Sequence, residues 1–235
     1  MPHKNKGMEE IKYRPSVEKL YGRVKNRALT QRQAGLFESL LPSISIASFD
    51  PEILSAYQNI SLEIGFGSGE HLFQLASTNP SKLFIGCEFF VNGIASLLSK
   101  IDEAGIRNIR IFQGNARKLI PEIPDNFLEY VFLLFPDPWP KRKHVYRRFV
   151  QEKTVLEIYR ILRNGGFFRI ATDCSQYAEW VRKVLTAPVL AEKFAIENMV
   201  NDESRPSESD WPKTRYEQKS TTECTFFSIQ RNSSQ

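Results

Sequence analysis

The stretch LEIGFGSG, Leu62 to Gly69, decides the fold of this 235-residue chain. It ends a short run of strand-forming residues that begins at position 60, and the segment after it, GEHLFQLAST, carries apolar residues at helical spacing. A strand, a glycine-rich turn and a helix in this order are typical of an open α/β sheet, in which ligands bind at the carboxyl ends of the strands. Glycine lets the backbone come close to a ligand there. We therefore expect a ligand site around Gly65, Gly67 and Gly69.

Strand and helix signals continue to alternate along the chain. We expect further strands at 82–88, 108–114, 127–135 and 167–173. We expect helices at 29–42, 91–105, 147–162 and 175–185, and a turn at 164–166. This alternation predicts an α/β fold with a mostly parallel sheet covered on both faces. The last two strand signals, at 193–200 and 221–231, have no helix between them, so we expect an antiparallel pair at one edge.

The composition is that of one globular domain in a reducing compartment. The three cysteines have no C-x-x-C spacing, which favours free thiols over a zinc or redox site, and the three histidines are too scattered to suggest a metal site. The chain shows no signal peptide, and no stretch approaches the roughly 18 apolar residues of a membrane span. We therefore expect a cytoplasmic protein with no membrane partner.

Positive charge is concentrated near the start of the sequence. The net charge is +5, but residues 1–33 hold nine lysines and arginines against three glutamates, so the remaining residues sum to −1. We expect residues 1–33 to form a basic arm that orders on a polyanion, and residues 34–235 to form a single domain. A second run, KRKHVYRR from Lys141 to Arg148, has five lysines and arginines and no acid. Two basic clusters favour a nucleic-acid partner.

The glycine stretch suits one nucleotide cofactor better than another. In the dinucleotide fingerprint G-x-G-x-x-G/A, Gly65 and Gly67 match, but Glu70 stands at the third small position. Glu63 and Glu70 flank the turn, where an anionic pyrophosphate would be repelled. S-adenosylmethionine carries a sulfonium and an ammonium, and its carboxylate can use the helix N-terminus near Gly67 to Glu70. We therefore expect S-adenosylmethionine as the cofactor.

Two polar residues at the ends of the next strands are expected to hold the nucleoside. Glu88 ends the strand at 82–88, where a carboxylate can accept hydrogen bonds from two ribose hydroxyls. Asn115 follows the strand at 108–114, where a side-chain oxygen can accept a bond from the adenine amino group.

The most unusual stretch is FPDPWPKRKH, Phe135 to His144. Three prolines stiffen its backbone, and a tryptophan in a solvent-facing loop is costly unless it packs or binds something. Trp139 is expected either to stack on a base or to pack beneath the loop. The strand before it ends where the reactive methyl group of the cofactor would lie, so we expect this loop to hold the methyl acceptor.

Four motifs together resemble one enzyme family. EIGFGSG (63–69), GCE (86–88), FPDPWPKRKH (135–144) and TRYE (214–217) are similar to motifs of the tRNA (guanine-N7)-methyltransferases. The resemblance implies a Rossmann-like class I methyltransferase fold: a seven-stranded, mostly parallel sheet with an antiparallel last strand and helices on both faces. It also implies methyl transfer from S-adenosylmethionine to N7 of one guanosine in the tRNA variable loop, which forms 7-methylguanosine.

The resemblance also assigns roles to individual residues. The cofactor would contact Glu63, Glu88, Asn115 and Asp137, of which Asp137 would also be catalytic. The tRNA would contact Lys141, Asp173, Thr214, Arg215, Tyr216 and Glu217. Many family members have aspartate at the position of Asn115, but an amide oxygen can still accept the adenine bond. Asp173 precedes a helical segment and is therefore also a candidate helix N-cap.

The acceptor atom limits what Asp137 is expected to do. Guanine N7 has a lone pair and no proton, so its attack on a methyl group needs no general base. The reaction leaves a positively charged purine, which a fixed carboxylate can stabilise. The same carboxylate could accept bonds from the N1 and N2 edge of guanine and so select the base.

Other functions remain open at this point. Methyltransferases that act on adenine amines place D-P-P-Y or a similar motif at the same strand end, but P-D-P-W differs in order and K-R-K-H has no place in that motif. A tRNA-binding protein without activity is disfavoured by the intact glycines and Asp137, and an NAD oxidoreductase by Glu70. The sequence does not distinguish a monomer from a homodimer.

Overall fold

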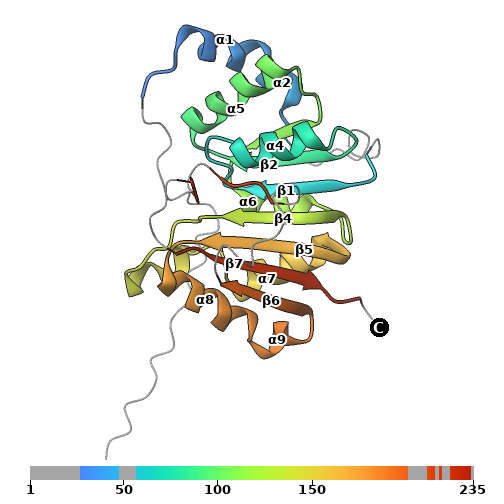
Figure 1. The fold of residues 1–235 in the computed structure, drawn as a ribbon, viewed down its shortest axis with the longest axis vertical. Helices are drawn as coiled ribbons and strands as arrows, with labels where there is room; N and C mark the ends of the chain where they lie inside the picture. Colours follow the sequence, from blue (N-terminus) through green and yellow to red (C-terminus); the bar gives the residue numbers. More distant parts are fainter. Residues whose placement is uncertain (1–26, 48–56, 201–210, 215–216, 219–222, 234–235) are drawn as a thin grey trace, which may run out of the picture.

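The computed structural model describes residues 27–47, 57–200, 211–214, 217–218 and 223–233. They form a single seven-stranded sheet in the order β3-β2-β1-β4-β5-β7-β6. Figure 1 shows the part of this order from β2 to β6, in which the strands follow one another down the page. The strands are β1 (Ile60–Ile64), β2 (Leu83–Glu88), β3 (Ile109–Gln113), β4 (Leu128–Leu134), β5 (Leu162–Thr172), β6 (Phe194–Val200) and β7 (Thr225–Arg231).

The pairing confirms the predicted mixed sheet. The pairs β1–β2, β1–β4, β2–β3 and β4–β5 are parallel, whereas β7 runs antiparallel to both β5 and β6. Every residue of β1 and β2 is buried, as expected for parallel strands that are covered on both faces.

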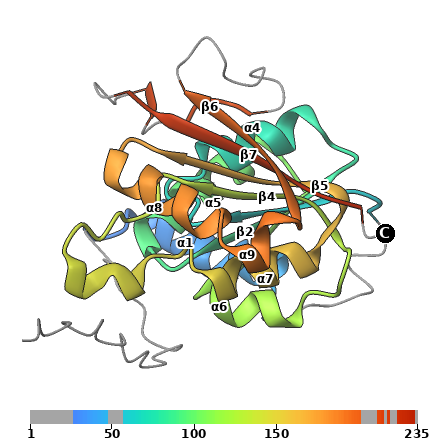
Figure 2. The ribbon, with the colours of Figure 1, turned by 90° about the horizontal axis from the view of Figure 1, so that it is seen from below.

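Helices cover both faces of the sheet. They are α1 (Gln31–Ser39), α2 (Leu41–Ile44), α4 (Glu70–Thr78), α5 (Val91–Ala104), α6 (Ala116–Leu119), α7 (Glu152–Ile161), α8 (Ser175–Leu185) and α9 (Pro188–Ala191), with 3₁₀ turns η1 (Ile120–Glu122) and η2 (Arg142–Arg147). One hydrophobic cluster joins α1, α2, α4 and α5 to the sheet, and a second joins α6, α7, α8 and α9 to its other face. Figure 2 shows α4 on one side and α6, α7 and α9 on the other.

Four predicted boundaries were wrong. The strand expected from position 221 begins at Thr225, since the described residues 223–224 are not in a strand. The helix expected at 29–42 is two helices, because Pro42 lies in the first turn of α2 and does not end α1. The turn expected at 164–166 lies inside β5, where Gly165 has φ of 74° and the register with β4 shifts. The helix expected from position 147 begins at Glu152, because Arg147 closes η2 and the residues between them are not helical.

The predicted basic arm falls largely on residues 1–26, which lie outside the described residues. Gln31–Gln33, at its end, belong to α1, and Thr30 caps that helix through a reciprocal hydrogen-bond pair with Gln33. The backbone of Arg27 exchanges two hydrogen bonds with the side chain of Asn92, at the start of α5. The described chain therefore begins beside the helix that packs on the glycine turn. Among the helices described, none is long and apolar enough to cross a membrane.

Candidate active site

The glycine turn after β1 has a backbone that glycine favours. Gly65, Gly67 and Gly69 have φ values of 73°, 55° and 75°, in the left-handed region. The turn also packs tightly against α5. A Cβ atom on Gly93 would lie 2.2 Å from the carbonyl oxygen of Gly67, so no side chain fits between the helix and the turn.

Glu88 fixes the turn from the end of β2. Its carboxylate accepts backbone hydrogen bonds from Gly67 at 2.9 Å, Phe89 at 2.7 Å and Phe90 at 3.0 Å. Burial raises the pKa of Glu88, although these three hydrogen bonds oppose that shift. A carboxylate offers about four lone-pair sites. One site on Oε2 is therefore left for a ligand, and a second ribose hydroxyl would have to displace a backbone amide.

Glu63 lies beneath the turn and away from the cavity. It is 3% exposed, and its Oε2 shares a hydrogen bond of 2.8 Å with Nδ1 of His71 on α4. The His71 ring meets the edge of Phe132 at a centroid distance of 4.8 Å. The carboxylate that the sequence places beside the cofactor is therefore held by a histidine in the core. Glu70, the other acid at the turn, lies 3.6 Å from the ammonium of Lys100.

Asn115 lies where the sequence predicts it and also has a local role. It is the N-cap of α6, and its Oδ1 accepts a hydrogen bond of 3.0 Å from the backbone of Arg117. The second lone pair of this oxygen can still accept a bond from a ligand.

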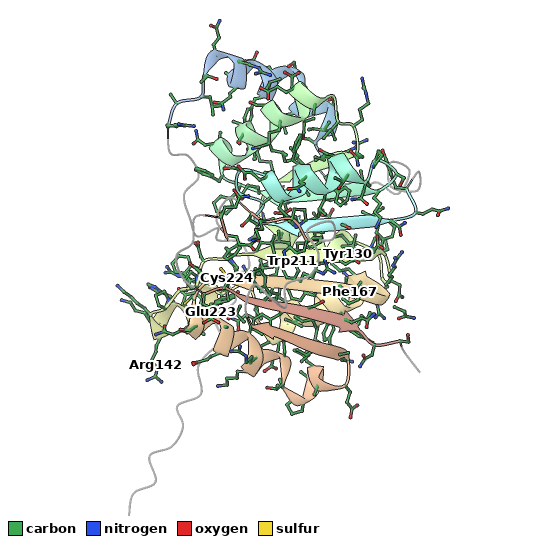
Figure 3. The ribbon with its side chains drawn as sticks, viewed as in Figure 1. Tyr130, Arg142, Phe167, Trp211, Glu223 and Cys224 are labelled. Carbon is green, nitrogen blue, oxygen red and sulfur yellow. The ribbon has the colours of Figure 1, made fainter. Side chains whose placement is uncertain are left out.

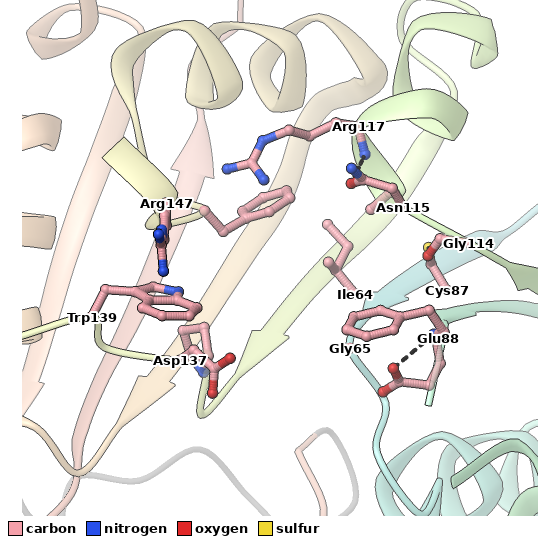
Figure 4. A pocket seen from close by; sticks show the side chains of 14 residues that line it. Ile64, Gly65, Cys87, Glu88, Gly114, Asn115, Arg117, Asp137, Trp139 and Arg147 are labelled. Atoms are coloured by element: carbon pink, nitrogen blue, oxygen red, sulfur yellow. Dashed lines mark hydrogen bonds between the residues drawn. The ribbon is translucent and has the colours of Figure 1, made fainter. Parts of the chain in front are cut away.

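Four of the predicted residues meet at one cavity beside the carboxyl ends of β1, β2 and β4. Gly65, Glu88, Asn115 and Asp137 all line it. Figure 4 shows Asp137 and Trp139 on one side and Glu88 and Asn115 on the other. Gly67 and Gly69 do not line the cavity, because Gly67 is turned toward Glu88 and Gly69 packs against Leu97.

Asp137 lies at the wall between two cavities. The second cavity is lined by the proline loop and the start of α8, and it shares Pro136 and Asp137 with the first. Partial burial raises the pKa of Asp137 above the usual aspartate range. A carboxylate at this wall can act on groups bound in both cavities.

The predicted substrate residues are only partly brought together. Asp173 lines the second cavity, but the N-cap of α8 is Cys174, so the interpretation of Asp173 as the cap was wrong. Lys141 is exposed at the start of η2. Thr214 and Glu217 exchange two hydrogen bonds of 3.3 and 3.0 Å. Arg215 and Tyr216 lie outside the described residues.

Comparisons with known proteins assign the chain to a family. Residues 57–225 match the model of a family described as "Putative methyltransferase". The chain is 40% identical over 213 residues to a tRNA (guanine-N(7)-)-methyltransferase of Paramagnetospirillum magneticum, across 87% of this chain and 88% of that protein. It is 41% identical over 208 residues to the enzyme of the same name from Caulobacter sp. strain K31, across 87% and 90%.

The chain belongs to the tRNA (guanine-N(7)-)-methyltransferase family.

Solved structures confirm the class I methyltransferase fold of this family member. A 16S rRNA (adenine(1408)-N(1))-methyltransferase from Catenulisporales acidiphilia superposes with a TM-score of 0.55 at 12% identity, covering 80% of this chain and 96% of that chain. The 16S rRNA methyltransferase KamB gives a TM-score of 0.56 at 15% identity, with the same coverage. At these identities the likeness concerns the fold alone.

The sequence missed one aromatic anchor in this methyltransferase family member. Trp211 is fully buried and packs edge-on against Phe226 and Phe132, at centroid distances of 5.4 and 6.5 Å. Figure 3 shows it at the centre of the molecule. Because Thr214 follows three residues later, Trp211 ties the start of the TRYE motif to the sheet. The sequence does contain a signal for this anchor, because a tryptophan within a long polar segment is unusual.

Proposed function

We propose that this chain transfers a methyl group from S-adenosylmethionine to N7 of a guanosine in the variable loop of tRNA. The observation that carries the proposal is the position of Asp137, which lines both the cavity of Gly65, Glu88 and Asn115 and the cavity beside α8. The names of the relatives support the substrate class and the atom that is modified. Because tRNA would be the substrate, we expect the enzyme to act in the cytoplasm.

The residues of the first cavity fit S-adenosylmethionine. Glu88 and Asn115 each keep an acceptor lone pair, which suits a ribose hydroxyl and the adenine amino group. The left-handed Gly65 leaves the floor of the cavity free of a side chain. Glu88 and Asp137 bring negative charge to a cationic ligand. We assign Glu63 an indirect part, through the turn that it supports together with His71.

The bound cofactor supplies an electrophilic methyl group on a sulfonium. Guanine N7 attacks with its own lone pair and no proton leaves, so Asp137 is not needed as a base. We propose that its carboxylate stabilises the positive charge that develops on the purine and orients the base by accepting from its N1 and N2 edge. Partial burial strengthens this interaction, because less water screens it.

The second cavity, which Asp173 also lines, is the proposed place of the target base. Lys141 is exposed at the start of η2, together with Arg142 and Lys143, and suits RNA phosphates, which position the substrate without reading its sequence. On the basis of the TRYE motif, we also assign contacts with the tRNA to Thr214, Arg215, Tyr216 and Glu217.

The proposal is tested with Asp137→Asn, which keeps the shape and removes the charge. With methyl-labelled S-adenosylmethionine and unmodified tRNA, we expect kcat to fall by about 10²- to 10³-fold. Chemical cleavage at 7-methylguanosine identifies the methylated atom, and tRNA without the variable-loop guanosine should accept no label. The matched control is Asp125→Asn, since Asp125 is exposed and pairs only with Arg160 among the ion pairs of the described chain. Label on an adenine amine, or none on any tRNA despite cofactor binding, would contradict the proposal.

A further inference from the structure

The proline loop has a backbone that local sequence does not favour. Phe135 and Trp139, on either side of Asp137, have φ values of 52° and 42°. Bulky residues adopt this left-handed region only when the surrounding structure holds them there. Three prolines in the loop lack an N–H group, so the loop has few donors of its own. Groups outside the loop must fix its carbonyl oxygens.

Arg148 supplies those groups. Its Nε donates to the carbonyl oxygen of Pro138 at 2.9 Å, and its Nη2 donates to that of Trp139 at 3.3 Å. These are the two residues that follow Asp137 in the chain. A planar guanidinium can direct two donors at neighbouring carbonyl groups, which a lysine ammonium cannot do with the same geometry. Arg148 therefore fixes the path of the backbone immediately after Asp137.

The guanidinium is itself held rigidly. Arg148 is only 6% exposed, and its Cζ lies over the rings of Tyr177 and Trp180 on α8, at 5.8 and 5.2 Å. The Trp180 indole donates to the carbonyl oxygen of Val150 at 2.7 Å. The carbonyl oxygen of Arg148 accepts from Nη2 of Arg117 at 3.0 Å. The loop is therefore fastened through Arg148 to a helix of the core.

The basic run KRKHVYRR thus has two parts with different environments. Lys141, Arg142 and Lys143 are exposed, and Figure 3 shows Arg142 pointing away from the body of the molecule. Arg147 lies with its Cζ over the rings of Trp139 and Tyr146, at 4.9 and 5.5 Å. Arg148 is buried, so it is not available to a phosphate, and its inclusion in an RNA-binding cluster was wrong.

We propose that Arg148 is a positioning residue for Asp137. It holds the carbonyl oxygens of Pro138 and Trp139, and so keeps the carboxylate at the wall between the two cavities without touching substrate or cofactor. The role in methyl transfer rests on the proposed function, whereas the effect on the loop does not.

The test compares Arg148→Met with Arg142→Met, two substitutions of the same kind in the same basic run. For Arg148→Met we expect kcat to fall by about tenfold or more, while the KM for tRNA, its salt dependence and the Kd for S-adenosylmethionine stay within about threefold of wild type. For Arg142→Met we expect the reverse: a raised KM, a flatter salt dependence and an unchanged kcat, since only a phosphate contact is lost.

Hydrogen exchange gives a readout that does not depend on activity. The amides of the peptide that spans 135–147 should exchange faster in Arg148→Met than in wild type, and those of 60–70 should not change. Arg148→Lys keeps the positive charge but loses the paired guanidinium donors. Its kcat and its exchange rates in 135–147 should therefore lie between those of Arg148→Met and wild type. It also serves as the test variant if Arg148→Met does not fold.

The outcomes separate the two proposals. An inactive wild type overturns the proposed function, while faster exchange in 135–147 of the variants still supports the action of Arg148 on the loop. An active wild type with kcat and loop exchange unchanged in Arg148→Met overturns the positioning role. A rise in KM and a loss of salt dependence, as in Arg142→Met, would mean that Arg148 contacts RNA and would overturn it equally.

Discussion

The glycine turn and the proline loop lie on opposite sides of one cavity and obtain their shapes in different ways. The turn from Gly65 to Gly69 uses residues for which left-handed backbone is easy, and one acid from the next strand, Glu88, fastens it. The loop from Phe135 to Pro140 places bulky residues in the same backbone region and depends on Arg148, which is anchored to α8. The cofactor side is therefore shaped by the backbone preferences of its own residues, and the acceptor side by tertiary contacts.

This difference predicts that the glycine turn is vulnerable to added bulk. The largest effect is expected from Gly93→Ala, because the new Cβ would lie 2.2 Å from the carbonyl oxygen of Gly67. Overpacking against backbone costs about 1–3 kcal/mol or more. We expect a loss of cofactor affinity of about 100-fold, measured by calorimetry, with a lower melting temperature.

Gly35→Ala is the matched control for that variant. Gly35 lies within α1, and a Cβ atom added there would have no neighbouring atom within 4 Å. The substitution should leave cofactor binding unchanged and stabilise the helix by up to about 1 kcal/mol. Equal cofactor affinity in Gly93→Ala and wild type would show that the turn is not held by close packing against α5.

Asp137 in the proline loop should affect the pH dependence of the rate. Burial raises the pKa of Asp137, and the proposed function needs the ionised carboxylate. As pH falls through this raised pKa the carboxylate becomes protonated, so kcat/KM for the cofactor, which reports ionisation of the free enzyme, should fall by about tenfold per pH unit below it. The acid limb should therefore lie above the usual aspartate range and be absent in Asp137→Asn. An identical acid limb in both proteins would assign it to another group.

A third prediction separates RNA binding from both loops. Residues 1–26 carry seven lysines and arginines against three glutamates. Their deletion should weaken tRNA binding by about tenfold and flatten its salt dependence, because fewer counterions are released on binding. Cofactor affinity and kcat at saturating tRNA should stay at the wild-type values. Binding titrations over a series of salt concentrations test this, and an unaltered slope would remove the segment from the RNA interface.

The smallest effect is expected from Lys100→Met. The Lys100 ammonium donates to the carbonyl oxygen of Ser68 at 2.8 Å, so it is a side-chain tether of the glycine turn, as Arg148 is of the proline loop. Because the turn is already held by its own backbone preference and by Glu88, we expect cofactor affinity to change by about threefold or less. A loss as large as that of Gly93→Ala would remove the contrast between the two loops.

The sequence predicted those parts of the molecule whose structure is set by neighbouring residues. The limits of β1 and α4 agree with the expected segments within one residue, because a buried strand, a glycine turn and an apolar helix face follow one another without interruption. The start of α7 was placed five residues too early. Apolar spacing continues before Glu152, but the chain there is held out of the helix by partners as distant as Arg117 and Trp180.

The candidate site divides in the same way. Gly65, Glu88, Asn115 and Asp137 could be found from the sequence, since each follows a recognisable strand and the carboxyl ends of parallel strands meet. The hydrogen bond between Glu63 and His71 could not be found, because it depends on which face of α4 meets β1. The burial of Arg148 could not be found either, since in the sequence it is one cation among five.

The strand order has a consequence for how the chain folds during synthesis. β7 lies between β5 and β6, so β6 has no partner in the sheet until residues 225–231 have been made. A nascent chain that stops before that point would carry an unpaired strand and the open edge of β5, which are surfaces that aggregate. The sheet is therefore expected to be completed only after β7 has been made, and ribosomes stalled before residue 225 should yield chains that need chaperones.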